Sequence, residues 1–263
     1  MKRLPLFFLA LVVLLSACAT KSAVRSAIQK DPALVMDVLR ENRLLLLDIV
    51  QQALADQDRL AQEQQWRQEL AHPFKPVIQG DRPIQGEVIA PVTVVEYSDF
   101  FCPYCGQGSQ TLHALLERHP DEIKAVFKHF PLHDGSAYLA SLFEAVAKQN
   151  PAAAWKFQGE LFAAQKAVQQ EGPDGPTLTG ILAGLGVDLA KVKTDAASTA
   201  VQERIAADTE EAREFGFRGT PMYLVGGVAV RGAAPLAEFE RVLELVRKGA
   251  EGAADCKDCG SVN

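Results

Sequence analysis

The chain has 263 residues, of which 48% are hydrophobic, so it can bury a core for one sizeable domain and still carry an extension. Its 33 acidic side chains outnumber its 27 basic ones, which gives a formal net charge of −6. A chain with this balance has no electrostatic basis for binding a phosphate backbone, so nucleic-acid binding is excluded as its function.

The N-terminal residues have the pattern of a secretory signal, which we assign to residues 1–17. A basic start precedes an apolar stretch at 4–15 that is too short to stay in a bilayer as a spanning helix. The run LSAC that ends at Cys18 resembles the lipobox of bacterial lipoproteins, and this resemblance implies that Cys18 is lipidated and anchors the chain in a membrane. Ala19 in the next position resembles the pattern that sorts such proteins to the outer membrane. The alternative is an ordinary cleavage site followed by an unmodified cysteine.

Small and polar residues at 18–30 indicate a tether. Asp31 and Pro32 then offer an N-cap and a first helical residue, and the helical pattern restarts near Asn42. These patterns predict a helical extension over 31–72 with leucines at heptad-like intervals. Such a stripe has to be buried, either against its own domain or against other copies of the chain. We favour self-association into a homo-oligomer.

The next part of the chain has strand-like patterns. Residues 73–91 are rich in Pro and Gly and are predicted as a linker with a short edge strand. Two apolar runs predict strands at 92–97 and 124–130, with an amphipathic helix between them. Two shorter apolar runs around the glycines at 226–227 are typical of a hairpin.

A long Ala- and Leu-rich segment separates the second strand from this hairpin. Its helical spacing over 136–216 predicts an inserted set of helices. A final helix is expected from Pro235 with Gly249 as its stop, and a flexible tail follows at 250–263. The expected order of strands and helices is that of an α/β domain.

The motif Cys102-Pro103-Tyr104-Cys105 stands where the first strand passes into the helix. A cysteine at the first turn of a helix faces unpaired N–H groups and the positive end of the helix dipole, so Cys102 is predicted to be a low-pKa nucleophile. Pro103 suits the first helical position, and the two-residue spacer lets Cys105 close a disulfide as the resolving thiol. Zinc sites share this spacing, but zinc needs four ligands and no second pair of Cys or His lies nearby at finger spacing. The motif therefore indicates a redox dithiol.

Three runs in this order, VEYSDFFCPYC, FKHFPLH and FRGTPMYLVGG, resemble the DsbA-like branch of the thioredoxin superfamily. The resemblance covers residues 84–249 and implies a thioredoxin-like fold with an inserted helical domain, to which the N-terminal helical extension is added. It also implies thiol-disulfide exchange with exported proteins that contain cysteines, without a cofactor, and recharging by a membrane redox partner.

Residue by residue, the resemblance assigns the attacking thiol to Cys102 and the buried thiol to Cys105. Thr220 and Pro221 match the loop whose cis proline receives the backbone of the substrate. Tyr104 is expected to contact substrate, and it occupies a position where the best-known oxidases carry His, so a weaker oxidant is expected. Thr220 before the proline, together with the helical extension, resembles the ScsC-like and disulfide-isomerase members. Oxidase and isomerase both stay open.

Glu96 lies inside an otherwise apolar strand and matches the carboxylate found under the disulfide of this family. The resemblance implies that it exchanges a proton with Cys105 during resolution, and burial would raise its pKa. The alternative is a polar strand residue that faces solvent or pairs with Lys128.

The five cysteines fit an oxidising compartment, because lipidation of Cys18 leaves two C-x-x-C pairs and no odd thiol. This count predicts a periplasmic protein. The second pair, Cys256 and Cys259, lies in the tail and has three interpretations: a local disulfide, an accessory dithiol that passes electrons to Cys102, or a clip for copper. A copper-handling lipoprotein that uses both pairs as ligands is the alternative function.

Two further polar features carry no site in this interpretation. His129 and His133 are four residues apart, but Pro131 between them prevents the helix that would put both on one face, so no metal site is predicted. Asp99 is expected to be a cap or a surface residue in the turn before the motif.

Overall fold

The computed structural model describes residues 21–255, so the expectations for Cys18, Cys256 and Cys259 lie outside the described residues. The chain divides into two compact units, residues 1–62 and residues 63–263, and each is described by itself. Within the described range, no helix is both long and apolar enough to cross a membrane.

The described part of the first unit is helical: α2 (Lys21–Lys30), α3 (Ala33–Glu41) and the beginning of α4 (Arg43–Ala71). We predicted a tether at 18–30, but most of that segment is the helix α2, because its Lys, Ala, Arg and Gln residues are good helix formers. The predicted restart of the helix near Asn42 is confirmed, since Asn42 is the C-cap of α3.

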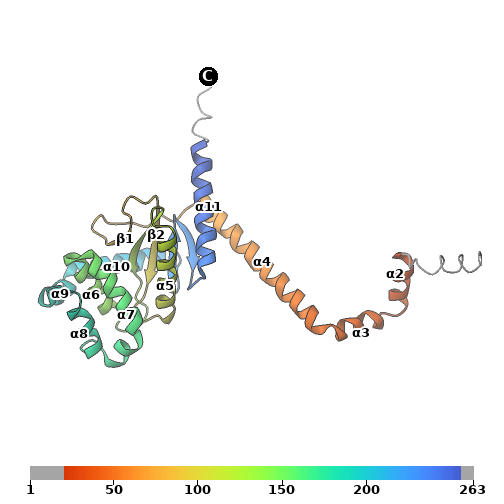
Figure 1. The fold of residues 1–263 in the computed structure, drawn as a ribbon, viewed down its shortest axis with the longest axis horizontal. Coiled ribbons are helices and arrows are strands. Elements are labelled where there is room, and N and C mark those ends of the chain that lie inside the picture. Colours follow the sequence, from red (N-terminus) through yellow and green to blue (C-terminus); the bar gives the residue numbers. More distant parts are fainter. Residues whose placement is uncertain (1–20, 256–263) are drawn as a thin grey trace, which may run out of the picture. The chain divides into compact units, whose positions relative to one another are not determined.

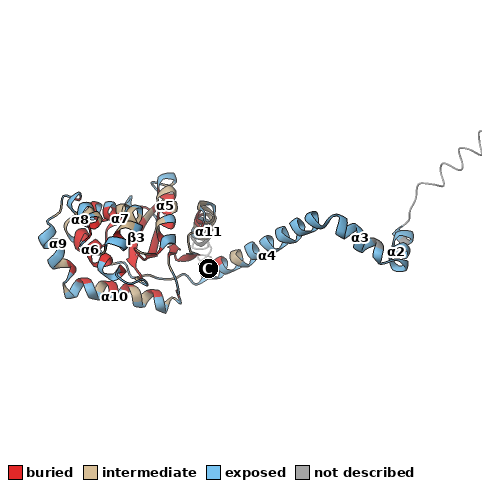
Figure 2. Ribbon diagram, turned by 90° about the horizontal axis from the view of Figure 1, so that it is seen from below, coloured by how far each residue is buried: buried red, intermediate tan, exposed pale blue. Residues whose placement is uncertain are grey.

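Apolar side chains of α3 and of the first turns of α4 are exposed (Figure 2). Leu44 is 74% exposed and Leu54 55% exposed. No side chain described between residues 21 and 61 is buried. The predicted leucine stripe is therefore present and uncovered in the described single chain.

The last turns of α4 belong to the second unit, which begins at Glu63. Trp66 is only 2% exposed, and its Nε1 donates a hydrogen bond to the carbonyl oxygen of Ala229 at 3.0 Å. The Glu69 carboxylate accepts a hydrogen bond from the backbone amide of Ala229 at 2.8 Å. The helix ends at Ala71, next to the predicted bound of the extension at residue 72, and one buried tryptophan anchors its last turns in the main domain.

The second unit contains a five-stranded sheet in the order β1-β3-β2-β4-β5 (Figure 1). Strands β2 and β3 run parallel and all other neighbours are antiparallel. The parallel pair ends with Ser98 opposite His129, so the turns that follow both strands emerge at the same edge. The predicted strands, hairpin and edge strand are confirmed. The strands are β1 (Ile84–Gly86), β2 (Val92–Ser98), β3 (Ile123–His129), β4 (Met222–Val225) and β5 (Val228–Arg231).

The predicted insertion between β3 and β4 consists of helices. A further helix lies between β2 and β3 in the sequence, and another follows β5. The predicted α/β fold with a helical insertion is confirmed. The final helix continues six residues beyond Gly249, and at that position a Cβ atom would lie 2.9 Å from Cδ2 of Leu70. The glycine thus permits a close helix approach instead of ending the helix. The helices are α5 (Pro103–Arg118), α6 (Ser136–Gln149), α7 (Pro151–Glu171), α8 (Pro176–Ala183), α9 (Leu189–Ala196), α10 (Thr199–Glu214) and α11 (Leu236–Asp255).

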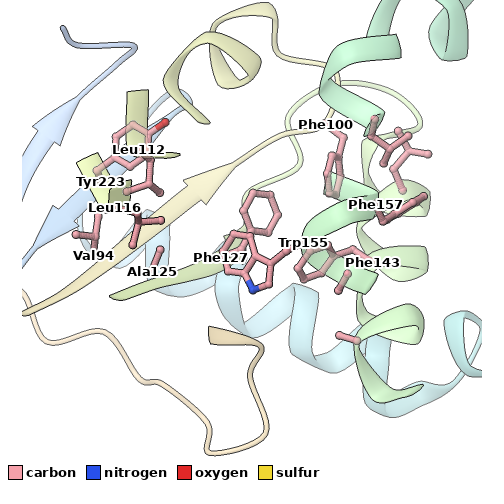
Figure 3. Packing of buried hydrophobic residues seen from close by; sticks show 14 of the residues in the cluster. Val94, Phe100, Leu112, Leu116, Ala125, Phe127, Phe143, Trp155, Phe157 and Tyr223 are labelled. Carbon is pink, nitrogen blue, oxygen red and sulfur yellow. The ribbon is translucent and has the colours of Figure 1, made fainter. Parts of the chain in front are cut away.

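Alternation along the strands separates two apolar layers. Val94 and Tyr223 of the sheet pack with Leu112 and Leu116 of α5 on one face (Figure 3). Glu96 lies two residues after Val94, so its side chain is on the face covered by α5. The opposite face holds a second cluster of buried residues: Val95, Tyr97, Val126, Phe130, Ala212, Phe217, Met222, Leu224 and Ala229.

Candidate active site

Cys102 and Cys105 stand at the N-terminus of α5, as the sequence predicted for a strand-to-helix junction. Cys102 is the N-cap of the helix with extended backbone angles, and Pro103 occupies the first turn. Both sulfurs are free thiols, and the residues are 5% and 0% exposed, respectively. Cys102 therefore keeps a small exposed fraction, whereas Cys105 is fully enclosed.

The two thiols differ in acidity. Interaction with the Cys105 thiol is the largest cause that lowers the pKa of Cys102 to about 5, and the amide groups of Tyr104 and Cys105 add to it. Burial is the largest cause that raises the pKa of Cys105 far above its usual range, and the hydrogen bond with Cys102 is the second. A thiolate at Cys102 and a protonated thiol at Cys105 are the states required of an attacking and a resolving cysteine.

The loop before β4 lies directly against the nucleophile. The Thr220–Pro221 peptide bond is cis, and the thiol of Cys102 donates a hydrogen bond to the carbonyl oxygen of Thr220 at 3.3 Å. On the facing helix, a Cβ atom at Gly108 would lie 3.0 Å from Cγ of Pro221. Gly108, which the sequence analysis did not single out, therefore allows α5 and the proline loop to approach each other.

Glu96 is fully buried below the dithiol on the face of the sheet covered by α5. Burial raises the pKa of its carboxyl group to about 8, so the group is mostly protonated at neutral pH. Nε2 of Gln158 lies 3.5 Å from its Oε2 atom, and Oε1 has no hydrogen-bond partner among the described residues. The Ser98 hydroxyl group forms no hydrogen bond among the described residues, but, against the larger effect of burial, its proximity acts to lower the pKa of both Glu96 and Cys105.

The alternative pairing of Glu96 with Lys128 is wrong. Lys128 lies opposite Tyr97 in the parallel register, so its side chain is on the other face of the sheet. There Nζ contacts the carboxylates of Glu211 and Asp208.

Asp99 is not a surface residue, as the sequence suggested it could be, but is 1% exposed. Its carboxylate accepts hydrogen bonds from the amides of Phe101 (2.7 Å), Leu132 (2.6 Å) and His133 (2.9 Å), and also from the Ser136 hydroxyl. Burial alone would raise the pKa of Asp99, but the hydrogen bonds from Ser136 and His133 hold it below its usual range. Asp99 thus joins the turns after β2 and β3, whose proximity follows from parallel pairing.

The main chain of Asp99 contacts both cysteines. Its carbonyl oxygen accepts a hydrogen bond from the amide of Cys102 at 3.1 Å, and its amide donates to Sγ of Cys105 at 3.4 Å. One residue therefore positions the dithiol through its backbone and the neighbouring turn through its side chain.

His133 brings a titratable imidazole to the nucleophile. Its Nδ1 atom pairs with Oδ2 of Asp99 at 2.8 Å, and its side chain is 43% exposed. The hydrogen bond with Asp99 raises the pKa of His133, and the negative charge of Cys102 acts in the same direction. By contrast, His129 is buried against Glu144, and residues 21–255 contain no group of three or more His, Cys, Asp or Glu side chains that could hold a metal ion.

Tyr104 occupies the spacer of the motif and is 63% exposed. Its ring is accessible at the surface, and its contact with substrate stays a prediction. Because it carries no positive charge, it cannot supply the thiolate stabilisation that an imidazole gives in that position.

Comparison with known proteins assigns this arrangement to a family. A profile of the DSBA-like thioredoxin domain matches residues 93–244, which include the dithiol and the cis-proline loop. The chain belongs to the DsbA-like thioredoxin family. The matched range contains Cys102 and Cys105, so the dithiol lies within the DsbA-like thioredoxin domain.

Solved DsbA-like structures share the fold. A thioredoxin-like oxidoreductase from Silicibacter pomeroyi DSS-3 is 26% identical, with a TM-score of 0.56 over 65% of this chain and 94% of that one. ScsC from Proteus mirabilis, in a transitional conformation, is 20% identical and covers 84% of this chain and 97% of its own, with a TM-score of 0.55. BdbD from Bacillus subtilis is 22% identical, covers 67% of this chain and 97% of its own, and has a TM-score of 0.57.

Curated relatives match over part of their length only. A Na(+)/H(+) antiporter NhaA from Herminiimonas arsenicoxydans is 32% identical over 166 residues, which are 63% of this chain and 26% of the antiporter. The chain spans about a quarter of the length of the curated relatives it matches. The name of the whole relative therefore describes that relative alone.

Proposed function

We propose that this DsbA-like protein is a lipid-anchored periplasmic enzyme that exchanges disulfides with exported proteins through Cys102 and Cys105. The observation that carries the proposal is the contrast between the two thiols. Cys102, with its pKa lowered to about 5, lies against the cis-proline loop, while Cys105 is enclosed behind it.

The reaction consists of two successive thiol–disulfide exchange steps. The Cys102 thiolate attacks one sulfur of a substrate disulfide, a mixed disulfide forms, and the other substrate sulfur leaves as a thiolate. Cys105 then transfers its proton to the Glu96 carboxylate. The resulting Cys105 thiolate attacks Sγ of Cys102, and this step releases the second substrate thiolate. Two electrons pass to the substrate and the enzyme holds the Cys102–Cys105 disulfide. Glu96 must be ionised to accept that proton, and its pKa of about 8 leaves a minor ionised fraction at neutral pH.

The reverse sequence oxidises a substrate dithiol. A membrane redox partner then has to accept two electrons from the reduced enzyme, and an isomerase needs a partner that keeps it reduced. The exposed apolar stripe on α3 and α4 supports self-association, and several dithiols in one assembly favour isomerisation. A largely reduced pool of the Cys102–Cys105 pair in the cell is expected for an isomerase, and a largely oxidised pool for an oxidase.

The location rests on the sequence. The signal at 1–17, the lipobox-like run ending at Cys18 and the even number of remaining cysteines support a periplasmic protein held by lipid, with sorting to the outer membrane. Labelling with a radioactive fatty acid tests it: Cys18→Ser should abolish incorporation and release the protein from the membrane fraction.

A turnover assay separates the enzyme from a copper-binding protein. The full chain should catalyse reduction of a small disulfide-bonded protein by glutathione, and Cys102→Ser should abolish turnover. The double variant Cys256→Ser/Cys259→Ser serves as the matched control and should retain it, since those cysteines lie in the tail. Stoichiometric copper binding without turnover in this assay would contradict the proposal.

A further inference from the structure

A cleft beside the nucleophile is not used by the exchange steps described above. It has a volume of about 570 Å3 and lies between the turn before α6 and the end of α7. Phe101, which directly precedes Cys102, forms one wall. Gln165 of α7 donates hydrogen bonds to the carbonyl oxygens of Phe100 (2.7 Å) and Cys102 (2.9 Å), so the α7 wall is tied to the cysteine turn.

The inner surface of the cleft is apolar. Leu139 of α6 is 2% exposed and Val168 of α7 is 1% exposed, and together with the ring of Phe101 they line it. Gly135 has a φ of +83°, and a Cβ atom there would lie 3.1 Å from Cε2 of Phe101. A larger residue at this position would therefore be strained in its backbone and would crowd the wall of the cleft.

The rim of the cleft is negative. Asp134 and Asp174 both line it and are exposed, and neither forms a hydrogen bond or ion pair within the described chain. No Lys or Arg occurs among the described residues that line the cleft. The imidazole of His133 pairs with the buried carboxylate of Asp99, and the charge of Asp134 also helps raise the pKa of His133. The two carboxylates at the mouth of the apolar slot thus form no ion pair with a Lys or Arg of the described residues.

An exposed aromatic ring completes this lining. Tyr138 is 40% exposed, and the charge of Asp174 is one of the causes, after burial, that raise the pKa of its hydroxyl group. A cation over such a ring is stabilised by the electron density of its face, and the effect adds to the attraction of nearby carboxylates.

We propose that this cleft binds a lysine or arginine side chain that flanks the reactive cysteine of the substrate. The aliphatic stem of such a side chain packs against Phe101, Leu139 and Val168, and its charged head reaches Asp134 and Asp174. An extended peptide advances about 3.3 Å per residue, so a residue within about three positions of the substrate cysteine reaches the cleft. The inference rests on the proposed function, because it names the substrates that Cys102 attacks fastest.

The test uses the reduced full chain and a set of short peptides that differ at one position. Each peptide carries one cysteine in a mixed disulfide with a small thiol, and arginine, lysine, glutamate or the neutral lysine analogue norleucine is placed at each of three positions on either side. The second-order rate of attack by Cys102 is measured at low and high salt. At one position, arginine and lysine should react about tenfold faster than norleucine at low salt, and this ratio should fall at high salt, because salt screens partly exposed ion pairs.

Three variants locate the preference. In Asp134→Asn/Asp174→Asn the arginine and norleucine peptides should react at equal rates. In Asp134→Lys/Asp174→Lys the glutamate peptide should become the faster one. The matched control Asp121→Asn removes the same charge from an exposed turn between α5 and β3 and should keep the preference.

Two results overturn the inference while leaving the proposed function intact. One is equal rates for arginine and norleucine at every position. The other is a preference that persists in the double asparagine variant, which would reflect the net charge of the whole chain. If no peptide reacts with Cys102, the proposed function fails and the inference fails with it.

Discussion

Oδ2 of Asp99 lies 2.8 Å from Nδ1 of His133, while the amide of the same aspartate donates to Sγ of Cys105 at 3.4 Å. The imidazole of this chain therefore reaches the dithiol from the turn after β3 instead of from the spacer, where Tyr104 stands. The negative charge of Cys102 helps raise the pKa of this imidazole, so a thiolate at Cys102 favours its protonated form.

Replacing this imidazole should make Cys102 less acidic. In His133→Gln the loss of a nearby cation should raise the pKa of Cys102 by about half a unit to one unit. Ultraviolet absorbance of the thiolate during a pH titration measures the shift. The control His119→Gln removes a histidine at the far end of α5 and should leave the pKa unchanged. An unchanged pKa in His133→Gln would show that the imidazole does not act on the thiolate.

Asp99→Ala should destabilise the fold strongly. Removing the carboxylate leaves amide groups of Phe101, Leu132 and His133 without their acceptor in a region that is partly shielded from water. Unsatisfied buried donors cost about 1 to 3 kcal/mol each, so we expect the free energy of unfolding to fall by at least about 3 kcal/mol. Denaturant unfolding measures this change, with exposed Asp121→Ala as the neutral comparison. A loss below about 1 kcal/mol would contradict the positioning role.

Glu96→Gln should stabilise the protein at neutral and mildly basic pH. Burial raises the folded-state pKa of Glu96 from 4.5 to about 8, so the folded state keeps a proton that the unfolded chain releases between these values. Stability contributed by this group is full below pH 4.5 and is lost as the pH rises to about 8. Glutamine removes that loss, which is on the order of 3 kcal/mol at pH 7.

Unfolding of parent and Glu96→Gln at pH 4 and pH 8 measures this difference. The two proteins should be similar at the lower pH, and the variant should be the more stable one at the higher pH. The variant should also accumulate mixed disulfide during turnover, because Cys105 loses its proton acceptor. Parallel pH profiles for both proteins would show that Glu96 keeps an ordinary pKa.

The elements of the redox domain could be predicted because each has a local signal. The apolar run of β2, the proline after Cys102 and the Gly-Gly turn at 226–227 depend on residues that are close in sequence. The role of Asp99 depends on the register that puts Ser98 opposite His129, which brings together turns more than thirty residues apart. Parallel pairing of the two predicted strands was the signal that could have indicated it.

Long-range packing decides the features that local patterns could not predict. Gly249 resembles a helix stop in sequence, but its contact with Leu70 shows that it serves helix packing. In the sequence, Trp66 lies in the polar part of a long helix. The structure shows that its Nε1 donates a hydrogen bond to the carbonyl oxygen of Ala229. Neither partner is visible from hydrophobic periodicity.

The burial of Trp66 in the main domain decides where the extension can be removed. A chain that begins at Glu63 should fold and keep exchange activity, whereas a chain that begins at Pro73 loses Trp66 and should be less stable by about 3 to 5 kcal/mol. Thermal unfolding compares the two. Sedimentation of the full chain and the chain from Glu63 tests the apolar stripe, and only the full chain should self-associate. Equal stability of the two truncated chains would contradict the assignment of Trp66 to the core.

The most direct test of thiol-disulfide exchange at this site is to map the covalent intermediate. In full-length Cys105→Ala, resolution is blocked, so a disulfide-bonded substrate should remain attached to the enzyme. Mass spectrometry of the digested complex should find one substrate cysteine joined to Cys102 in a one-to-one complex. Attachment at Cys256 or Cys259, or no attachment at all, would contradict the assignment of Cys102 as the nucleophile.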